Sequence, residues 1–231
     1  MVDAIPTVLR QRLSGLMDAG EEARALRFVR TEDRHSFTAA HGAVRLLLGA
    51  MIDRAPAALR FVTGEFGKPR LADAGGIEFN MSHSGGIVLI ALASGEPVGI
   101  DVERVRPIAE RAAIIERYLH PGEAADLAGF ADGAAELAFF RCWSRKEAVV
   151  KALGRGMNLD LNRYRVACAP SAVPAVLALE GEETPGNAWS LADLAPSPAH
   201  VAAVATRRRP ARVSCHGFDA AVVLGAAGYQ S

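Results

Sequence analysis

The chain has 231 residues, of which 50% are hydrophobic and 23% charged, and this balance excludes a fibrous or disordered protein. The 26 Lys and Arg residues equal the 26 Asp and Glu residues, so no overall field attracts nucleic acid and any site for a polyanion must be local. The length is sufficient for one large domain or two small ones, and either would bury a substantial core.

Residues 1–14 lack the apolar core of a signal peptide, and the longest apolar run, Ile87–Ala93, is too short to span a bilayer. The three cysteines, at positions 142, 168 and 215, are widely spaced and show no metal-ligand pattern. They fit free thiols that serve as packing residues in a reducing compartment. We therefore expect a cytoplasmic protein with no membrane partner and no nucleic-acid partner.

The first strong helical pattern runs from Thr31 to about Arg54, with Thr31 as the candidate N-cap. Pro56 prevents its continuation. A second face of this helix carries a cationic stripe, formed by Arg34, Thr38, His41 and Arg45. On spacing alone, the simplest interpretation of the cationic stripe is a solvated face.

Between Phe61 and Glu103, short apolar stretches broken by Gly, Pro, Asn and Ser indicate strands and turns. Residues 77–81 alternate between apolar and polar side chains. The apolar run 87–93 fits a central strand, residues 94–97 a turn, and residues 98–103 its partner strand. This pattern predicts a hairpin between the last two strands.

The second half begins with helical patterns at 109–119 and 122–129, and its strongest helix covers 134–153 before Gly154. Four short strands should follow, at 163–168, 175–179, 188–193 and 199–206. The order of helix, strands, helices and strands predicts the α+β class. It also predicts two α+β halves, residues 1–103 and 109–231, joined by a linker at 104–108.

Two acidic residues on the strand at 98–103, Asp101 and Glu103, should point to the same face. Carboxylates held that close raise each other's pKa unless a cation lies between them, and oxygen ligands suit Mg²⁺ or Mn²⁺. On the strongest helix, Trp143, Glu147 and Lys151 lie four residues apart, so Glu147 could add a third carboxylate. Taken singly, the first pair could be a solvated acidic pair and the second a plain ion pair.

Two further segments could bind phosphate. The polar stretch 80–86 lies between two apolar strands and contains Ser82, His83 and two glycines, so it could form a turn that cradles phosphate. In Gly67-Lys68-Pro69, a lysine precedes a rigid proline. Each segment alone is equally typical of an ordinary surface turn.

Together, these segments match one family in order and separation. The sequence resembles the Sfp-type (surfactin-type) 4′-phosphopantetheinyl transferases over roughly residues 20–206. The resemblance is carried by Gly67-Lys68-Pro69, by Phe79-Asn80-Met81-Ser82-His83-Ser84, by Val98-Gly99-Ile100-Asp101-Val102-Glu103 and by residues 143–152. The form Trp-x-x-Lys-Glu-Ala at 143–148 resembles the branch that serves polyketide, nonribosomal-peptide or related carrier domains.

The resemblance implies two pseudo-symmetric halves packed around a central cleft that binds coenzyme A and Mg²⁺. It implies the metal ligands Asp101, Glu103 and Glu147 and the catalytic residues Glu147 and Lys151. The implied coenzyme A contacts are Lys68, Ser82, His83, Lys151 and Arg45. Glu123 is similar to a further acidic residue near the reactive phosphates. Where many relatives have an arginine this chain has Ser36, and the replacement is expected from Arg34, His41 or Arg45.

The implied reaction moves phosphopantetheine from coenzyme A to a serine of an acyl or peptidyl carrier protein, and the chain is expected to be a monomer. The base that takes the serine proton is either Glu147 or a metal-bound water. Two other functions compete. A metal-dependent phosphodiester hydrolase would also need clustered carboxylates and a lysine. A module that binds coenzyme A or a carrier protein would need no catalysis.

Overall fold

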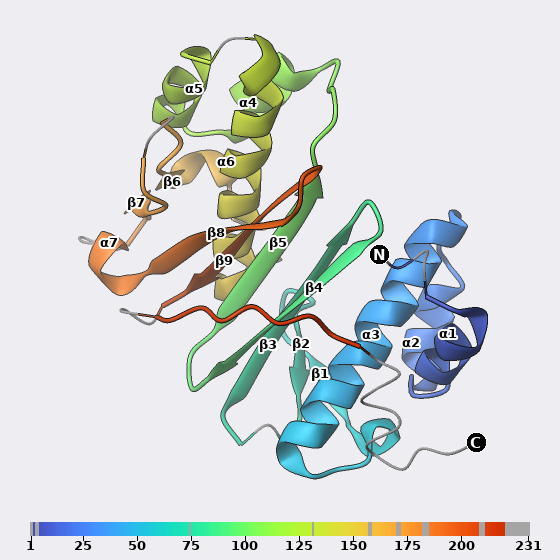
Figure 1. Ribbon diagram of the computed structural model, residues 1–231. Helices are drawn as coiled ribbons and strands as arrows, with labels where there is room; N and C mark the ends of the chain where they lie inside the picture. Colours follow the sequence, from blue (N-terminus) through green and yellow to red (C-terminus); the bar gives the residue numbers. More distant parts are fainter. Residues whose placement is uncertain are drawn as a thin grey trace.

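The computed structural model describes residues 2, 5–73, 75–130, 132–156, 159–169, 172–181, 185–207 and 211–219. Its first elements are α1 (Thr7–Ser14), α2 (Ala19–Ala25), α3 (Thr31–Ile52), a 3₁₀ turn (Pro56–Ala58), β1 (Phe61–Thr63), β2 (Pro69–Leu71), β3 (Ile77–Ser84) and β4 (Ile87–Ser94). They are followed by β5 (Val98–Arg104), α4 (Arg111–Tyr118), α5 (Pro121–Ala128), α6 (Asp132–Leu153), a 3₁₀ turn (Leu161–Arg163), β6 (Arg165–Val166), β7 (Val176–Ala178), α7 (Pro185–Ala188), β8 (Ser190–Ser197) and β9 (His200–Thr206). The predicted α+β class is confirmed (Figure 1).

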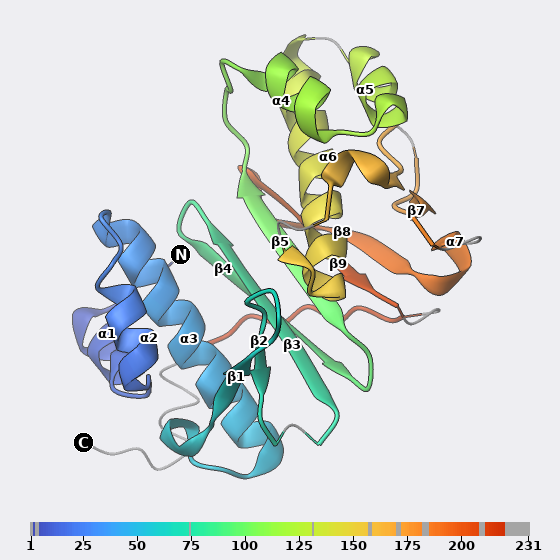
Figure 2. The ribbon, with the colours of Figure 1, turned by 180° about the vertical axis from the view of Figure 1, so that it is seen from behind.

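The two halves repeat one order of elements. Each has a helix of 22 residues, α3 or α6, followed by a short strand pair and then a long antiparallel pair. The short pairs are β1-β2 and β6-β7, and the long pairs are β3-β4 and β8-β9. In Figure 2, α6 lies across the sheet of its half and α3 lies along the strands of the other. This arrangement agrees with the predicted architecture of two related halves.

The predicted hairpin between residues 87–93 and 98–103 is wrong. Strand β4 pairs instead with β3, and Gly85 and Gly86 form the two-residue turn between them, with φ of 52° and 81°. Two glycines are suited to such a turn because both central positions need positive φ. Strand β5 pairs with β9 over its full length. The strand assigned to the first half by the predicted boundary therefore belongs to the sheet of the second half.

The halves meet where β3 lies beside β5. These two fully described strands form no backbone ladder with each other; instead, alternate polar side chains of β3 accept hydrogen bonds from the N–H groups of β5. The bonds join Asn80 Oδ1 to Ile100 N (2.9 Å), Ser82 Oγ to Val102 N (3.3 Å) and Ser84 Oγ to Arg104 N (3.1 Å). Because both residue numbers rise together, β3 and β5 run parallel.

The N-cap of helix α3 lies one residue before the predicted position. Its N-cap is Arg30, with no side-chain cap bond, so Thr31 is the first helical residue rather than the N-cap. The helix ends at Ile52, and the residue after it, Asp53, adopts a left-handed conformation with φ of 51°. Its apolar side packs on the strands of its half through Val44 and Leu48, which belong to the same buried cluster as Phe79 of β3.

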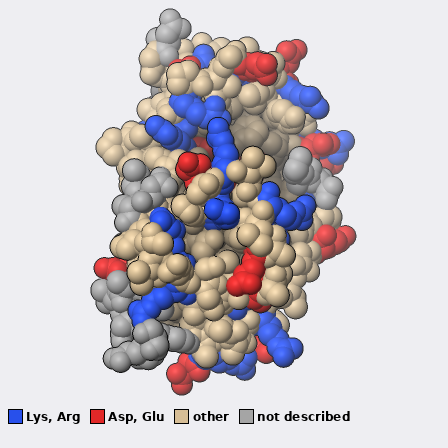
Figure 3. Space-filling view, turned by 90° about the vertical axis from the view of Figure 1, so that its right-hand side faces the viewer, with Lys and Arg blue, Asp and Glu red and all other residues tan. Residues whose placement is uncertain are grey.

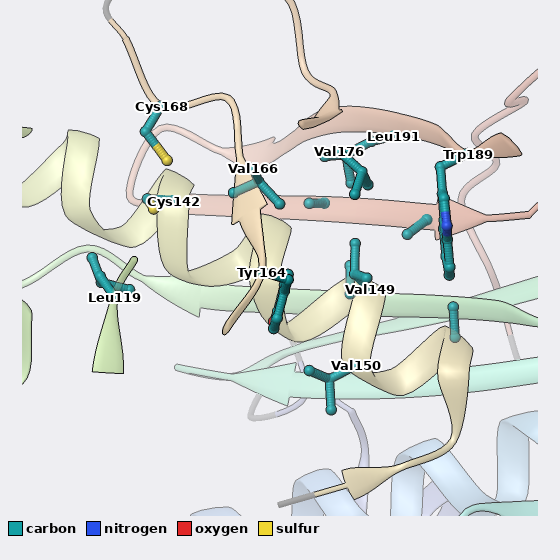
Figure 4. Packing of buried hydrophobic residues seen from close by; sticks show 14 of the residues in the cluster. Leu119, Cys142, Val149, Val150, Tyr164, Val166, Cys168, Val176, Trp189 and Leu191 are labelled. Carbon is teal, nitrogen blue, oxygen red and sulfur yellow. The ribbon is translucent and has the colours of Figure 1, made fainter. Parts of the chain in front are cut away.

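The larger hydrophobic core lies in the second half, between α6 and the β5-β9-β8 sheet. Figure 4 shows Val149 of α6 facing this sheet, with Val166, Val176 and Trp189 around it. Gly99 of β5 lies where the helix approaches the sheet most closely. A Cβ atom there would overlap the carbonyl oxygen of Ala148 and the amide nitrogen of Ala152. The glycine thus allows α6 to lie directly on the strand that carries Asp101.

We expect Gly99→Ala to destabilise the protein by at least about 3 kcal/mol, because the overlapping atoms are helix backbone and cannot move aside as side chains can. Urea unfolding would measure the change. Gly133→Ala is the matched control, since it lies on α6, is exposed and would place its Cβ in open space. The control should retain or slightly raise stability. Equal stability of Gly99→Ala and the wild type would contradict this packing.

The chain beyond β9 returns to the first half. Residues 211–219 cross the strands toward α3 in Figure 1 and line, with β4 and α3, a cavity of about 1420 Å³. Val98 and Ile100 of β5 also line it, so this cavity lies on the face of β5 opposite Asp101 and Glu103. None of the described helices is both long and apolar enough to cross a membrane.

Candidate functional site

The acidic residues of β5 and α6 meet on one side of the sheet. Asp101 is only 4% exposed, and its Oδ1 accepts hydrogen bonds from Lys151 Nζ at 2.7 Å and Ser82 Oγ at 3.1 Å. Glu103 Oε2 accepts a hydrogen bond from Ser84 Oγ at 3.0 Å. Glu147 lies on α6 one turn before Lys151, on the same stripe of the helix. Two elements distant in sequence thus bring the acidic groups and the lysine together.

The electrostatics of Glu103 and Glu147 support this convergence. Burial raises the pKa of Glu103, and the charge of Asp101 raises it further, against the opposing effect of Ser84. The pKa of Glu147 is also raised, first by burial and then by Asp101, while Lys151 opposes the shift. Both carboxylates therefore lie within reach of the charge of Asp101. Lys151 and Arg106 oppose the shift at Glu103, and Lys151 opposes it at Glu147, so two cations face three carboxylates.

The chemistry of these residues suits a divalent cation. Their carboxylate oxygens are not all within 4.8 Å of one another in this structure; among the described residues, Glu123, Cys142 and Cys168 form the group that meets that distance. Asp101 Oδ2 is buried and has no hydrogen-bond partner among the described residues, which is costly for a carboxylate oxygen. Oxygen donors from three carboxylates are the set that Mg²⁺ or Mn²⁺ prefers over softer metals. The orphaned oxygen and the surplus of negative charge are both explained by such an ion.

The raised pKa of Glu147 leads to a stability prediction. A carboxyl whose pKa is raised by folding destabilises the fold when ionised, and this effect disappears as pH falls to its ordinary pKa of 4.5. In metal-free buffer at pH 8, Glu147→Gln should therefore melt at a higher temperature than the wild type, and the gain should vanish near pH 4. With Mg²⁺ present, the order should reverse.

Differential scanning calorimetry over this pH range would test the prediction. Glu116→Gln is the control because Glu116 is an exposed glutamate on α4. It should melt with the wild type under every condition. A Glu147→Gln variant that melts below the wild type in metal-free buffer at pH 8 would contradict the prediction.

The polar stretch predicted to form a turn is largely strand. Residues 80–84 belong to β3, and only Gly85 and Gly86 form the turn. Ser82 faces Asp101 and Lys151 rather than open solvent. His83 is half-buried, and burial lowers its pKa while the charge of Asp33 on α3 opposes the shift. The strand thus places Ser82 at the carboxylates and His83 toward the start of α3.

Lys68 lies at the opposite end of the joint between the halves. Its Nζ donates a hydrogen bond to the carbonyl oxygen of Val98 at 2.9 Å, and burial lowers its pKa. Val98 begins β5, and Gly154, at the end of α6, lies close to the Lys68 side chain. No contact between Lys68 and the carboxylates is present among the described side chains. The structure brings Lys151 and Ser82 together but holds Lys68 apart.

The assignment of Arg45 to coenzyme A binding is wrong in this structure. Its side chain is 0% exposed, and the nitrogen atoms are bound within the first half. The partners are Glu21 Oε2 (2.7 Å), Asp18 Oδ2 (2.8 Å) and the carbonyl oxygens of Pro56 and Leu59 (each 3.0 Å). His41 is also buried and contacts Glu21 Oε1 at 2.7 Å. This end of the cationic stripe joins α2 to α3 and is neither solvated nor free for a ligand.

Arg34, at the other end of the stripe, remains accessible. It is half-buried, its side chain has no hydrogen-bond or ion-pair partner among the described residues, and it lines a pocket of about 420 Å³ between α1, α2 and α3. Arg10 and His35 line the same pocket. Of the three residues expected to replace the arginine absent at Ser36, only Arg34 has a side chain that could still meet an anion.

Glu123 does not lie free beside reactive groups. Its side chain and that of Lys146 are both 0% exposed, and Lys146 Nζ contacts both carboxylate oxygens, at 2.8 and 2.7 Å. The N–H groups of His120 and Val166 fill the other acceptor positions, at 2.9 and 2.7 Å. Glu123 therefore binds α5 to α6 inside the second half. Lys146, next to Glu147, is a structural residue not identified from sequence.

Cys142 and Cys168 point toward one another beside this ion pair (Figure 4). Their sulfur atoms and a Glu123 oxygen lie within 4.8 Å of one another, which is compatible with a metal site. However, the Glu123 acceptor positions are already filled, and the pKa of Cys142 is raised by its contact with Cys168 and by burial. Neutral thiols are poor metal ligands. The two cysteines are packing residues, as predicted, whereas Cys215 is exposed.

The sequence matches one family of known proteins. Residues 97–205 match the model of the 4′-phosphopantetheinyl transferase superfamily, a span that runs from the start of β5 into β9. The chain is 36% identical to the 4′-phosphopantetheinyl transferase HetI of Nostoc sp., over 84% of this chain and 80% of HetI. It is 32% identical to the transferase ffp and 31% identical to the transferase Sfp, both of Bacillus subtilis. These alignments cover 67% and 68% of this chain and 68% of each relative. On these matches, the chain belongs to the 4′-phosphopantetheinyl transferase superfamily.

Proposed function

We propose that this protein transfers the 4′-phosphopantetheine group of coenzyme A to a serine of an apo acyl or peptidyl carrier protein, releasing 3′,5′-ADP. One observation carries the proposal beyond family membership. Asp101, Glu103, Glu147 and Lys151 converge at the joint between the halves, with a buried carboxylate oxygen left unpaired. That arrangement suits a cation that binds a diphosphate.

The metal is Mg²⁺, held by Asp101, Glu103 and Glu147. When bound, it neutralises charge on the diphosphate and orients the reacting phosphorus. Asp101 offers its unpaired Oδ2, since Oδ1 is already bound by Lys151 and Ser82. Glu103 is likewise held through one oxygen by Ser84.

In the reaction, the carrier serine oxygen attacks the β-phosphorus of coenzyme A, and the bond from this phosphorus to the leaving 3′,5′-ADP oxygen breaks. The serine proton passes either to Glu147 or to a water held at the metal site. Lys151, whose ammonium is held at Asp101, offsets negative charge that grows on the leaving oxygen. Lys151→Ala should therefore lower kcat much more than coenzyme A affinity.

The coenzyme A contacts that remain consistent with the structure are Lys68, Ser82, His83 and Lys151. Each lies on or beside the joint formed by β3, β5 and α6. Arg34 is a candidate for a further phosphate contact in place of Arg45. Figure 3 shows Lys and Arg side chains gathered in the upper middle of one face, so positive charge is local although the net charge is zero.

The carrier partner belongs to polyketide, nonribosomal-peptide or related pathways. This inference rests on Trp143, on Lys146-Glu147-Ala148 and on the resemblance of that motif to one branch of the family. We further propose that the protein acts in the cytoplasm as a monomer.

The test is transfer of phosphopantetheine from coenzyme A to a panel of apo carrier domains, followed by the mass shift of each carrier. A shift that needs Mg²⁺ and leaves 3′,5′-ADP supports the proposal. Incubation with small phosphodiesters and nucleic acids tests the competing hydrolase. Absence of any shift across acyl and peptidyl carriers, with hydrolysis of a diester instead, would overturn the proposed reaction.

A further inference from the structure

The side chains of β3 that join the halves also contact the carboxylates of β5. Ser82 lies against Asp101 and Ser84 against Glu103, at 3.1 and 3.0 Å. Both serines are on alternate positions of β3 and so face the same strand. The joint and the acidic site are therefore built from the same two hydroxyl groups.

The direction of each hydroxyl bond follows from its other partners. A serine hydroxyl has one hydrogen and two acceptor positions. The N–H of Arg104 can only donate, so Ser84 Oγ accepts there and its single hydrogen is directed to Glu103 Oε2. Ser82 Oγ accepts from the N–H of Val102 and from Lys151 Nζ, which directs its hydrogen to Asp101.

Each serine hydroxyl donates to one oxygen of the neighbouring carboxylate and does not contact the other oxygen. Glu103 Oε1 and Asp101 Oδ2 have no hydrogen bond to any described residue. Glu103 has more rotatable bonds than Asp101 and lacks the lysine contact that Asp101 has. Ser84 is the hydrogen-bond donor that holds its carboxylate in one orientation in the described structure.

We infer that Ser84 is a positioning residue for Glu103: its hydroxyl, oriented by the N–H of Arg104, fixes the carboxylate so that the opposite oxygen faces the cation. The inference rests on the proposed function, because it needs a divalent cation at Asp101, Glu103 and Glu147. It assigns Ser84 a role through the metal ligand and no direct contact with coenzyme A. It also makes metal binding depend on contact between β3 and β5, and hence between the two halves.

Ser84→Ala is the test, with Mn²⁺ binding to the purified full chain followed by electron paramagnetic resonance and Mg²⁺ added as competitor. Partners that orient a metal ligand contribute about 10- to 100-fold to metal affinity, so we expect at least a roughly tenfold weaker Mn²⁺ affinity. Ser84→Thr retains the hydroxyl on a residue suited to a strand, and should stay within about threefold of the wild type. Ser94→Ala, at the far end of the same hairpin, is the control and should bind Mn²⁺ like the wild type.

Hydrogen exchange gives a second measurement that does not need metal. In Ser84→Ala, the amide of Arg104 loses its acceptor and should exchange faster, whereas the amide of Ile100, bound by Asn80, should be unchanged. Unaltered Mn²⁺ affinity in folded Ser84→Ala, while the wild type binds Mn²⁺, would overturn this inference alone. Failure of the wild type to bind Mn²⁺ or Mg²⁺ would overturn the proposed metal site and the inference with it.

Discussion

Asp101→Asn should lower kcat/KM for phosphopantetheine transfer by at least about a thousandfold, equivalent to roughly 4 kcal/mol of transition-state stabilisation. The change keeps the size of the side chain and an oxygen that can still accept from Lys151 and Ser82. It replaces the buried, unpaired Oδ2 or its partner with an amide nitrogen, which cannot bind a cation. It also removes the Asp101 charge, which adds to the effect of burial in raising the pKa values of Glu103 and Glu147.

The assay is the mass shift of an apo carrier domain at several Mg²⁺ concentrations, together with circular dichroism to verify folding. Asp53→Asn is the matched control, because it makes the same chemical change at the exposed end of α3, where the left-handed backbone accepts asparagine readily. The control should keep full activity. Transfer by Asp101→Asn at a rate within threefold of the control would refute the proposed metal site.

The local parts of this site could be predicted from sequence because they depend on regular periods. Alternation along a strand places Asp101 and Glu103 on one face, and helical spacing places Glu147 one turn before Lys151. Each inference requires only the geometry of one strand or one helix. In the structure, Asp101 contacts Lys151, and its charge acts on both Glu103 and Glu147.

The non-local parts could not be predicted in the same way. The sequence pattern of β5 is equally compatible with β4 or β9 as its pairing partner. In the structure β5 pairs with β9, and α6 packs onto Gly99 of β5; both contacts join residues far apart in the sequence. Spacing correctly places Arg45 and His41 on one face of α3. Whether that face meets water or protein depends on α2, whose capping box places Glu21 beside both.

The sequence around Lys146 contains a pattern that predicts a buried lysine. Its neighbours at helical spacing, Cys142, Val149 and Val150, are all apolar, so the lysine lies on a buried face of α6. A lysine there requires a buried acidic partner. The partner, Glu123, opens α5 in the motif His120-Pro121-Gly122-Glu123, which forms a capping box. The pairing itself spans 23 residues and cannot be derived from spacing.

Lys146→Met should destabilise the protein by about 3–5 kcal/mol, the usual effect of removing one partner from a buried ion pair. Methionine fills a similar volume, so the loss would come from Glu123, which would remain buried without its cation. The variant also removes the bond from Lys146 Nζ to the carbonyl oxygen of Tyr164. Arg163→Met is the control, since Arg163 pairs with Glu180 on the exposed surface and such pairs contribute at most about 1 kcal/mol.

Urea unfolding of the single variants and of the double variant Lys146→Met/Glu123→Gln separates two contributions to the free energy of unfolding. One is the loss of the ion pair, and the other is the burial of the Glu123 carboxylate without a cation. Glu123→Gln removes the uncompensated carboxylate, so the double variant should recover part of the stability lost in Lys146→Met. The coupling between the two substitutions should be about 1–3 kcal/mol. A double variant less stable than Lys146→Met by the full effect of Glu123→Gln would show that the two side chains act independently. Since Glu147 follows Lys146 directly in α6, loss of this pair should also reduce transfer, because the helix that carries Glu147 and Lys151 would lose its ion pair with α5.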